Sequence, residues 1–116
     1  MHELALADSI VSTVRREVER QNLPPVKTIV VRIGALSAVV PDALLFNYEV
    51  LTRDTPLERA KLVIEEVPVR ARCRACRREF SVDGLVFACP ECDSGQIDVI
   101  AGEELDIAYI EVEDTS

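Results

Sequence analysis

The sequence of 116 residues predicts an α/β fold of the α+β type, with two helices on a small three-stranded sheet and an inserted zinc-ribbon-like module. Three observations lead to this prediction. Helix-like and strand-like hydrophobic periods alternate over residues 1–69, two Cys-x-x-Cys pairs follow, and one more strand-like segment comes after them. We therefore expect an α/β domain made of residues 1–69 and 99–116. The metal-binding module, residues 70–98, is inserted before the last strand.

The first two elements are a helix and a strand. The N-terminal segment repeats apolar residues every three or four positions, as an amphipathic helix does, and this stripe consists of Leu4, Ala7, Ile10, Val11, Val14 and Val18. Asn22 and the Pro24-Pro25 pair end this helix. Residues 27–33 are rich in β-branched side chains, which predicts a strand that ends at Gly34.

A second helix and two further strands complete the predicted domain. Pro41 and Asp42 suit the first turn of a helix, which continues to about Arg53. Residues 61–67 form the second predicted strand, and residues 105–112, beyond the cysteines, form the third.

The four cysteines have the spacing of one metal site. Their order is Cys73-x-x-Cys76, twelve intervening residues, and Cys89-x-x-Cys92. Four thiolates in two such pairs suit a closed tetrahedral site, which is typical of structural Zn(II). Two disulfides, a redox-active pair and an iron site remain as alternatives. An iron site would make the chain a rubredoxin-like electron carrier.

Composition and charge restrict the possible functions. The chain has a net charge of −8, and the excess of acidic residues lies entirely outside residues 70–100. Such a surface repels phosphate backbones. No apolar run is long enough to span a membrane and no targeting segment is visible, so we expect a cytoplasmic protein. No catalytic constellation accompanies the single histidine, so we do not expect an enzyme.

Five arginines in the cysteine segment support a competing function. They are Arg70, Arg72, Arg74, Arg77 and Arg78. They could contact phosphates, which would make the chain a zinc-ribbon nucleic-acid-binding module. They could instead compensate the negative charge of a four-thiolate zinc site. Because the module contains few aromatic side chains for base stacking, we favour charge compensation.

The first three residues offer a different set of metal donors. The α-amine of Met1, the backbone nitrogen of His2 and its imidazole can form adjacent chelate rings around one ion. Ni(II) and Cu(II) favour tetragonal nitrogen sites of this kind. Glu3 could add a carboxylate oxygen or a further backbone nitrogen. A single histidine near the start of a chain also occurs by chance, so the residues alone leave this site open.

Taken together, the motifs resemble those of the HypA/HybF family of hydrogenase nickel incorporation proteins, over essentially the whole chain. The motifs are Met1-His2-Glu3-Leu4, Val31-Arg32-Ile33-Gly34-Ala35-Leu36-Ser37, Pro41-Asp42-Ala43-Leu44, the two cysteine pairs, Gly102-x-Glu104-Leu105 and Ile110-Glu111-Val112. The opening tripeptide combined with the spaced cysteine pairs is the specific part of this resemblance.

The resemblance implies a nickel metallochaperone that serves [NiFe] hydrogenase maturation. It implies that Ni(II) binds at Met1, His2 and Glu3, and that Zn(II) binds at the cysteines Cys73, Cys76, Cys89 and Cys92. The implied partners are a HypB-type GTPase and the hydrogenase large subunit, with a homodimer as a further possibility. One position departs from the family: many relatives carry an acidic residue just before the proline of the second helix, where this chain has Val40. Asp42 is the acid near enough to take its place.

Overall fold

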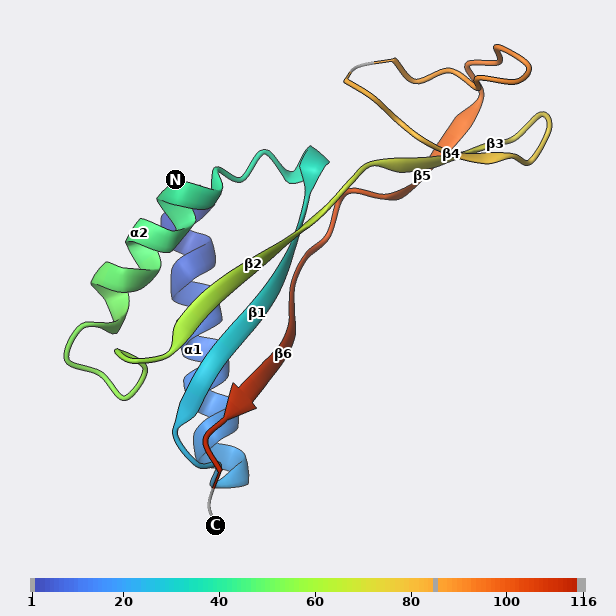
Figure 1. Cartoon of the computed structure of the whole chain (residues 1–116). Helices are drawn as coiled ribbons and strands as arrows, with labels where there is room; N and C mark the ends of the chain where they lie inside the picture. Colours follow the sequence, from blue (N-terminus) through green and yellow to red (C-terminus); the bar gives the residue numbers. More distant parts are fainter. Residues whose placement is uncertain (1, 85, 115–116) are drawn as a thin grey trace. The chain divides into compact units, whose positions relative to one another are not determined.

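The computed structural model describes residues 2–84 and 86–114, apart from the side chain of His2 (Figure 1). The chain forms two compact units. The first comprises residues 1–31, 39–65 and 106–116, and the second comprises residues 32–38 and 66–105. The predicted cysteine module, residues 70–98, lies within the second unit. Neither of the α-helices is long and apolar enough to span a lipid bilayer.

The first unit contains two helices and most of a three-stranded sheet. The helices are α1 (His2–Gln21) and α2 (Pro41–Thr52), and the strands are β1 (Val26–Gly34), β2 (Lys61–Val67) and β6 (Leu105–Val112). The strand order is β2-β1-β6. Figure 1 shows that β1 and β2 run in the same direction and that β6 runs in the opposite one. These elements confirm the predicted fold class.

The central strand, β1, supplies much of the aliphatic core of the first unit. Ile29, Val30 and Val31 are buried one after another, so both faces of β1 are covered. Val14 of α1 and Leu44 of α2 are among the largest fully buried side chains in the described part of the chain. Burying each such side chain contributes about 1.5–3 kcal/mol, so these contacts hold the helices on the sheet.

One buried polar group ties α2 to the loop beyond it. The hydroxyl of Tyr48 donates a hydrogen bond of 2.9 Å to the carbonyl oxygen of Ala60, and burial raises the pKa of Tyr48 to about 12. A buried hydroxyl without a partner would be costly. This bond therefore fixes how the chain enters β2.

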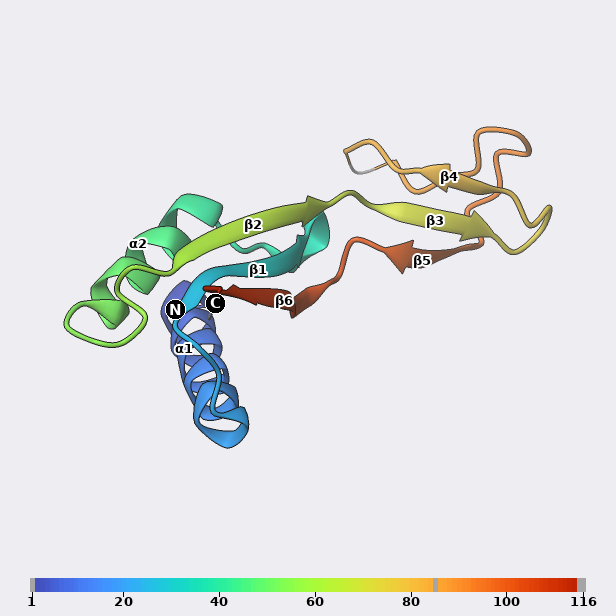
Figure 2. The ribbon, with the colours of Figure 1, turned by 60° about the horizontal axis from the view of Figure 1, so that its bottom comes forward.

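The second unit contains a separate sheet in the order β4-β3-β5 (Figure 2). Its strands are β3 (Arg70–Cys73), β4 (Glu79–Ser81) and β5 (Ile97–Ala101), and β3 pairs antiparallel with both neighbours. A short 3-10 turn, η1 (Ala35–Ser37), also belongs to this unit. The core of the unit includes Cys73 and Cys89 beside Ala71 and Phe80. Two of the cysteines are thus part of the apolar packing.

Two glycines lie where backbones of the second unit approach closely. The backbone N–H of Gly34 donates to the carbonyl oxygen of Glu104 at 2.7 Å, and the N–H of Leu36 donates to that of Gly102 at 2.7 Å. A Cβ on Gly34 would collide with the Gly102 carbonyl. A Cβ on Gly102, whose φ is +116°, would lie 2.9 Å from Cα of Val69. Neither position accepts a larger residue without moving the backbone.

We therefore expect Gly34→Ala to destabilise the protein by about 1–3 kcal/mol, because the new methyl group overpacks the contact with Gly102. The matched control is Gly95→Ala, since Gly95 has no atom within 4 Å of an added Cβ. This control should leave the free energy of unfolding within about 0.5 kcal/mol of the unchanged chain. Urea unfolding of the unchanged chain and the two variants measures both effects. Equal stability of the two variants would contradict the close contact.

Candidate metal centre

The four cysteine sulfurs form one cluster. Sγ of Cys73 lies 3.5 Å from Sγ of Cys92, and Sγ of Cys76 lies 3.6 Å from Sγ of Cys89. All four ligand atoms lie within 4.8 Å of one another, and all four cysteines are free thiols, so the structure contains neither of the two alternative disulfides. A tetrahedron with metal–sulfur bonds of about 2.3 Å has edges of about 3.8 Å. The sulfurs therefore already stand at nearly the spacing that one tetrahedral ion requires.

The two cysteine pairs are built as matching turns. The N–H of Arg77 donates to the carbonyl oxygen of Cys73 at 2.8 Å, and the N–H of Asp93 donates to that of Cys89 at 2.9 Å. Arg77 and Asp93 each directly follow the second cysteine of a pair, and both have left-handed backbone angles, with φ of 65° and 59°. A residue in this region bends the chain sharply back on itself. Sequence reasoning names Arg77 only for its charge and misses the backbone role of both residues, although their equivalent positions after each cysteine pair were a signal.

Backbone N–H groups favour the charged form of the first sulfur of each pair. The N–H of Cys76 points at Sγ of Cys73 at 3.5 Å and lowers the pKa of the Cys73 thiol to about 6. The N–H of Cys92 lowers the pKa of Cys89 in the same way. At Cys92 itself the N–H of Ser94 acts to lower the pKa, but the Cys73 sulfur and burial raise it to about 12. Four thiolates this close repel one another and therefore need a cation between them.

Four of the five arginines at positions 70–78 contact neighbouring side chains. Arg72 contacts Glu79 at 2.9 Å, Arg74 contacts Asp98 at 3.4 Å, and Arg78 contacts Glu91 at 3.5 Å. Arg70 donates a hydrogen bond of 2.9 Å to the hydroxyl of Ser81. Exposed pairs of this kind add little stability. The acidic partners, however, neutralise the positive charge of these arginines, which a nucleic-acid-binding module would use to contact phosphates.

The N-terminal candidate site lies only partly within the described structure. Met1 and the side chain of His2 are outside the described residues, whereas the backbone of His2 begins α1. The carboxylate of Glu3 accepts a hydrogen bond of 3.0 Å from the backbone N–H of Val40. The structure thus describes the third of the three proposed nickel ligands, and it places that carboxylate at the start of α2.

The carboxylate of Glu3 lies at the start of α2, a helix that has no side-chain N-cap hydrogen bond. Val40 is the N-cap residue of α2 and has no side chain that can accept a hydrogen bond, and Pro41 follows it at the first helical position. A carboxylate at this end satisfies an N–H group and complements the positive end of the helix dipole. Sequence reasoning noted Val40 but missed this contact, which joins residues 37 positions apart. Asp42 lies exposed in the first turn of α2.

Comparison with known proteins gives a consistent result. The sequence model of the family described as "Hydrogenase/urease nickel incorporation, metallochaperone, hypA" matches residues 1–112. The chain is 43% identical over 116 residues to "Hydrogenase maturation factor HypA" of Desulfosudis oleivorans, covering 98% of this chain and 100% of the relative. It is 42% identical over 113 residues to the factor of the same name in Geobacter metallireducens, covering 97% of this chain and 100% of the relative.

Two solved structures share the fold. One is titled "Solution structure of HypA protein", with a TM-score of 0.74 at 22% identity and 97% coverage of both chains. The other is the solution structure of the Ni metallochaperone HypA from Helicobacter pylori, with a TM-score of 0.66 at 20% identity, covering 95% of this chain and 96% of that one.

Proposed function

Since this chain belongs to the HypA family of hydrogenase and urease nickel incorporation metallochaperones, we propose that it carries Ni(II) at its N-terminus during [NiFe] hydrogenase maturation. The proposed donors are Met1, His2 and Glu3. The observation that supports this proposal most directly is that α1 begins at His2. Residues 1–69 and 99–116 would be the nickel-binding domain, and residues 70–98 the zinc-binding module.

The start of a helix favours backbone nitrogen as a metal ligand. The first four N–H groups of an α-helix have no acceptor within the helix. The amides of His2 and Glu3 can therefore lose a proton to nickel without breaking a helical hydrogen bond. The resulting negative charge lies at the positive end of the helix dipole, which stabilises it.

The contact between Glu3 and Val40 indicates which atom of Glu3 would bind the ion. Because the carboxylate already accepts a hydrogen bond from the N–H of Val40, we assign the backbone nitrogen of Glu3 to nickel. The carboxylate then anchors the start of α1 against the start of α2. The chelate would thus be held on two helices instead of a loose tail.

We propose Zn(II) for the four-cysteine cluster, with a structural role. Cys73, Cys76, Cys89 and Cys92 fit this ion because they supply four thiolates near tetrahedral spacing and leave no position for a substrate. The bound ion would compensate the negative charge of the four thiolates and crosslink the two cysteine turns. The cysteines themselves anchor both turns to the apolar core of the second unit.

A carrier with this site needs no catalytic groups of its own. Acid competes with nickel for the imidazole and the α-amine, whose ordinary pKa values are about 6.5 and about 8, so protonation would favour release. The proposed recipients are a HypB-type GTPase and the hydrogenase large subunit. The chain would act as a non-enzymatic cytoplasmic carrier.

Calorimetric titration with Ni(II) tests the proposal on zinc-loaded protein that begins at Met1. We expect binding of one ion per chain, with affinity that falls between pH 7.5 and pH 6. The control is the same chain with the α-amine of Met1 acetylated, which removes that donor from the chelate. We expect acetylation to remove tight binding. Equal affinity of the two proteins would refute the N-terminal site.

A further inference from the structure

The outer edge of β6 is open to pairing. In the strand order β2-β1-β6, β6 pairs with β1 along only one side, and Figure 1 shows it at the end of the sheet. Within residues 2–84 and 86–114, no strand pairs with its other side. About half of the N–H and C=O groups of an edge strand point outward, where they can bind another extended chain.

A pocket opens beside this edge, between α1 and β6. Its volume is about 310 Å³, and its apolar lining consists of Val14, Leu23, Ile107, Tyr109 and Ile110. Tyr109 remains 53% exposed, although its ring is one of the largest apolar groups of the strand. A strand added at this edge would place alternate side chains toward the pocket. The pocket has room for one large apolar side chain.

The charges around the edge indicate the chemistry of an added strand. No Lys or Arg follows Arg78 in the sequence. β6 and the two residues after it carry four exposed acids, Asp106, Glu111, Glu113 and Asp114. On the α1 side of the pocket, Glu17 is paired with Arg20 at 2.7 Å, so this pair adds little net charge. The edge is therefore acidic along its length.

We propose that the outer edge of β6 binds an extended, basic segment of a partner protein as an added β-strand, with one apolar side chain of that segment in the pocket between α1 and β6. Backbone hydrogen bonds would give affinity, and the pocket and the acids would give specificity. A second copy of this chain is a poorer occupant, because pairing two β6 edges would bring their acidic residues together. This inference does not depend on the nickel site.

The test uses a synthetic peptide as the probe. It has seven residues in which lysine alternates with valine, with phenylalanine in place of the central valine, and both ends are blocked. We expect titration into the ¹⁵N-labelled, zinc-loaded full chain at low salt to shift the amide signals of residues 106–112 and the pocket. The same peptide with glutamate in place of lysine should not bind. N-methylation at alternate backbone nitrogens should abolish binding, because those positions can no longer donate.

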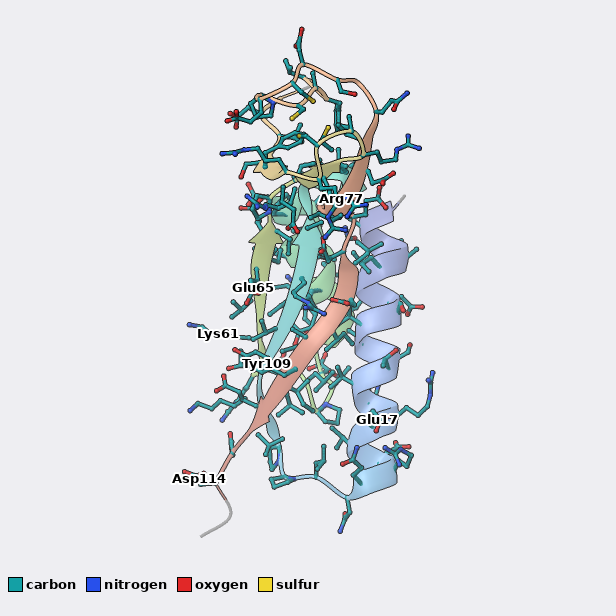
Figure 3. All side chains as sticks on the ribbon, turned by 90° about the vertical axis from the view of Figure 1, so that its right-hand side faces the viewer. Glu17, Lys61, Glu65, Arg77, Tyr109 and Asp114 are labelled. Atoms are coloured by element: carbon teal, nitrogen blue, oxygen red, sulfur yellow. The ribbon has the colours of Figure 1, made fainter. Side chains whose placement is uncertain are left out.

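Variants at exposed positions separate this surface from general charge attraction. Glu111→Lys should weaken binding roughly fivefold to tenfold, since it replaces favourable ion pairs by repulsion. Tyr109→Ala should also weaken binding, through loss of the pocket wall. The matched control is Glu65→Lys on the opposite edge strand, β2. Figure 3 shows Glu65 and Lys61 on the side of the sheet away from α1. This control should change the dissociation constant less than twofold.

Zinc content and circular dichroism confirm that each variant is folded. The proposal is overturned if the basic peptide does not bind, if the glutamate peptide binds equally well, or if Glu65→Lys weakens binding as much as Glu111→Lys. It is also overturned if the chain alone forms a dimer whose interface is β6. In that case a second copy is the occupant.

Discussion

Replacing His2 by Ala is expected to abolish tight nickel binding while leaving the four-cysteine site loaded with zinc. The substitution removes the imidazole donor and with it one of the chelate rings. We expect the affinity to fall by roughly 100-fold or more, which corresponds to about 2.8 kcal/mol. Calorimetry with Ni(II) and metal analysis of the same samples measure the two sites separately. The cluster should keep its zinc, because its four ligands are all sulfur.

The matched control for this substitution is Glu3→Gln. A glutamine retains the backbone nitrogen that we assign to nickel and keeps an oxygen that can accept the Val40 N–H. Nickel affinity should therefore stay within severalfold of that of the unchanged chain. If His2→Ala binds nickel as well as the unchanged chain does, the N-terminal assignment is wrong. Spectroscopic detection of nickel among the thiolates would have the same consequence.

Replacing Cys73 by Ala is expected to remove zinc and unfold the second unit. Cys73 is fully buried in the core of that unit, and its backbone N–H donates to the carbonyl oxygen of Arg78 at 2.9 Å. Zinc stabilises small four-ligand sites by about 10–16 kcal/mol at pH 7, and a site with three ligands forfeits much of this. A sheet as small as β4-β3-β5 has too little apolar area to fold without it.

Metal analysis and amide hydrogen exchange measure this result. Zinc content should fall from one ion per chain to none, and protection of the β3 and β5 amides should be lost. The α-helical signal of α1 and α2 should persist. Ala75→Ser is the matched control, since Ala75 is exposed between the first two cysteines and is not a ligand. A zinc-loaded Cys73→Ala protein with protected strands would contradict the structural role.

Local patterns in the sequence predict the helices, the first sheet and the cysteine cluster. The apolar periods of α1 and of β1 are strong because each element buries one or both of its faces. The spacing of the cysteines is equally informative, because four thiolates in two short pairs suit few other arrangements. The sequence pattern does not predict β5 (Ile97–Ala101) as a strand. This strand is short, and its half-buried residues alternate with exposed ones. Its partner β3 ends at Cys73, far earlier in the sequence, so no local pattern shows the pairing.

Contacts between distant residues could not be predicted from the sequence. The bond between Glu3 and Val40 depends on how α1 and α2 pack. The sequence indicates only that Gly34 ends a strand and that Gly102 belongs to a family motif. Their physical requirement is the close approach of two backbones. The exposure of Tyr109 depends on the position of β6 at an edge, which a single strand pattern does not reveal.

The register of β3 with β5 also has a consequence for the order of folding. Arg70 and Ala101 are direct partners in that sheet, so the ends of the intervening segment meet when the metal is bound. Until then, β6 has to find β1 across a long flexible loop, and closing such a loop is slow and entropically costly. Zinc uptake would therefore precede completion of the larger sheet. A newly synthesised chain deprived of zinc would pair β6 with β1 more slowly, and the β1 edge left exposed meanwhile would make it prone to aggregation.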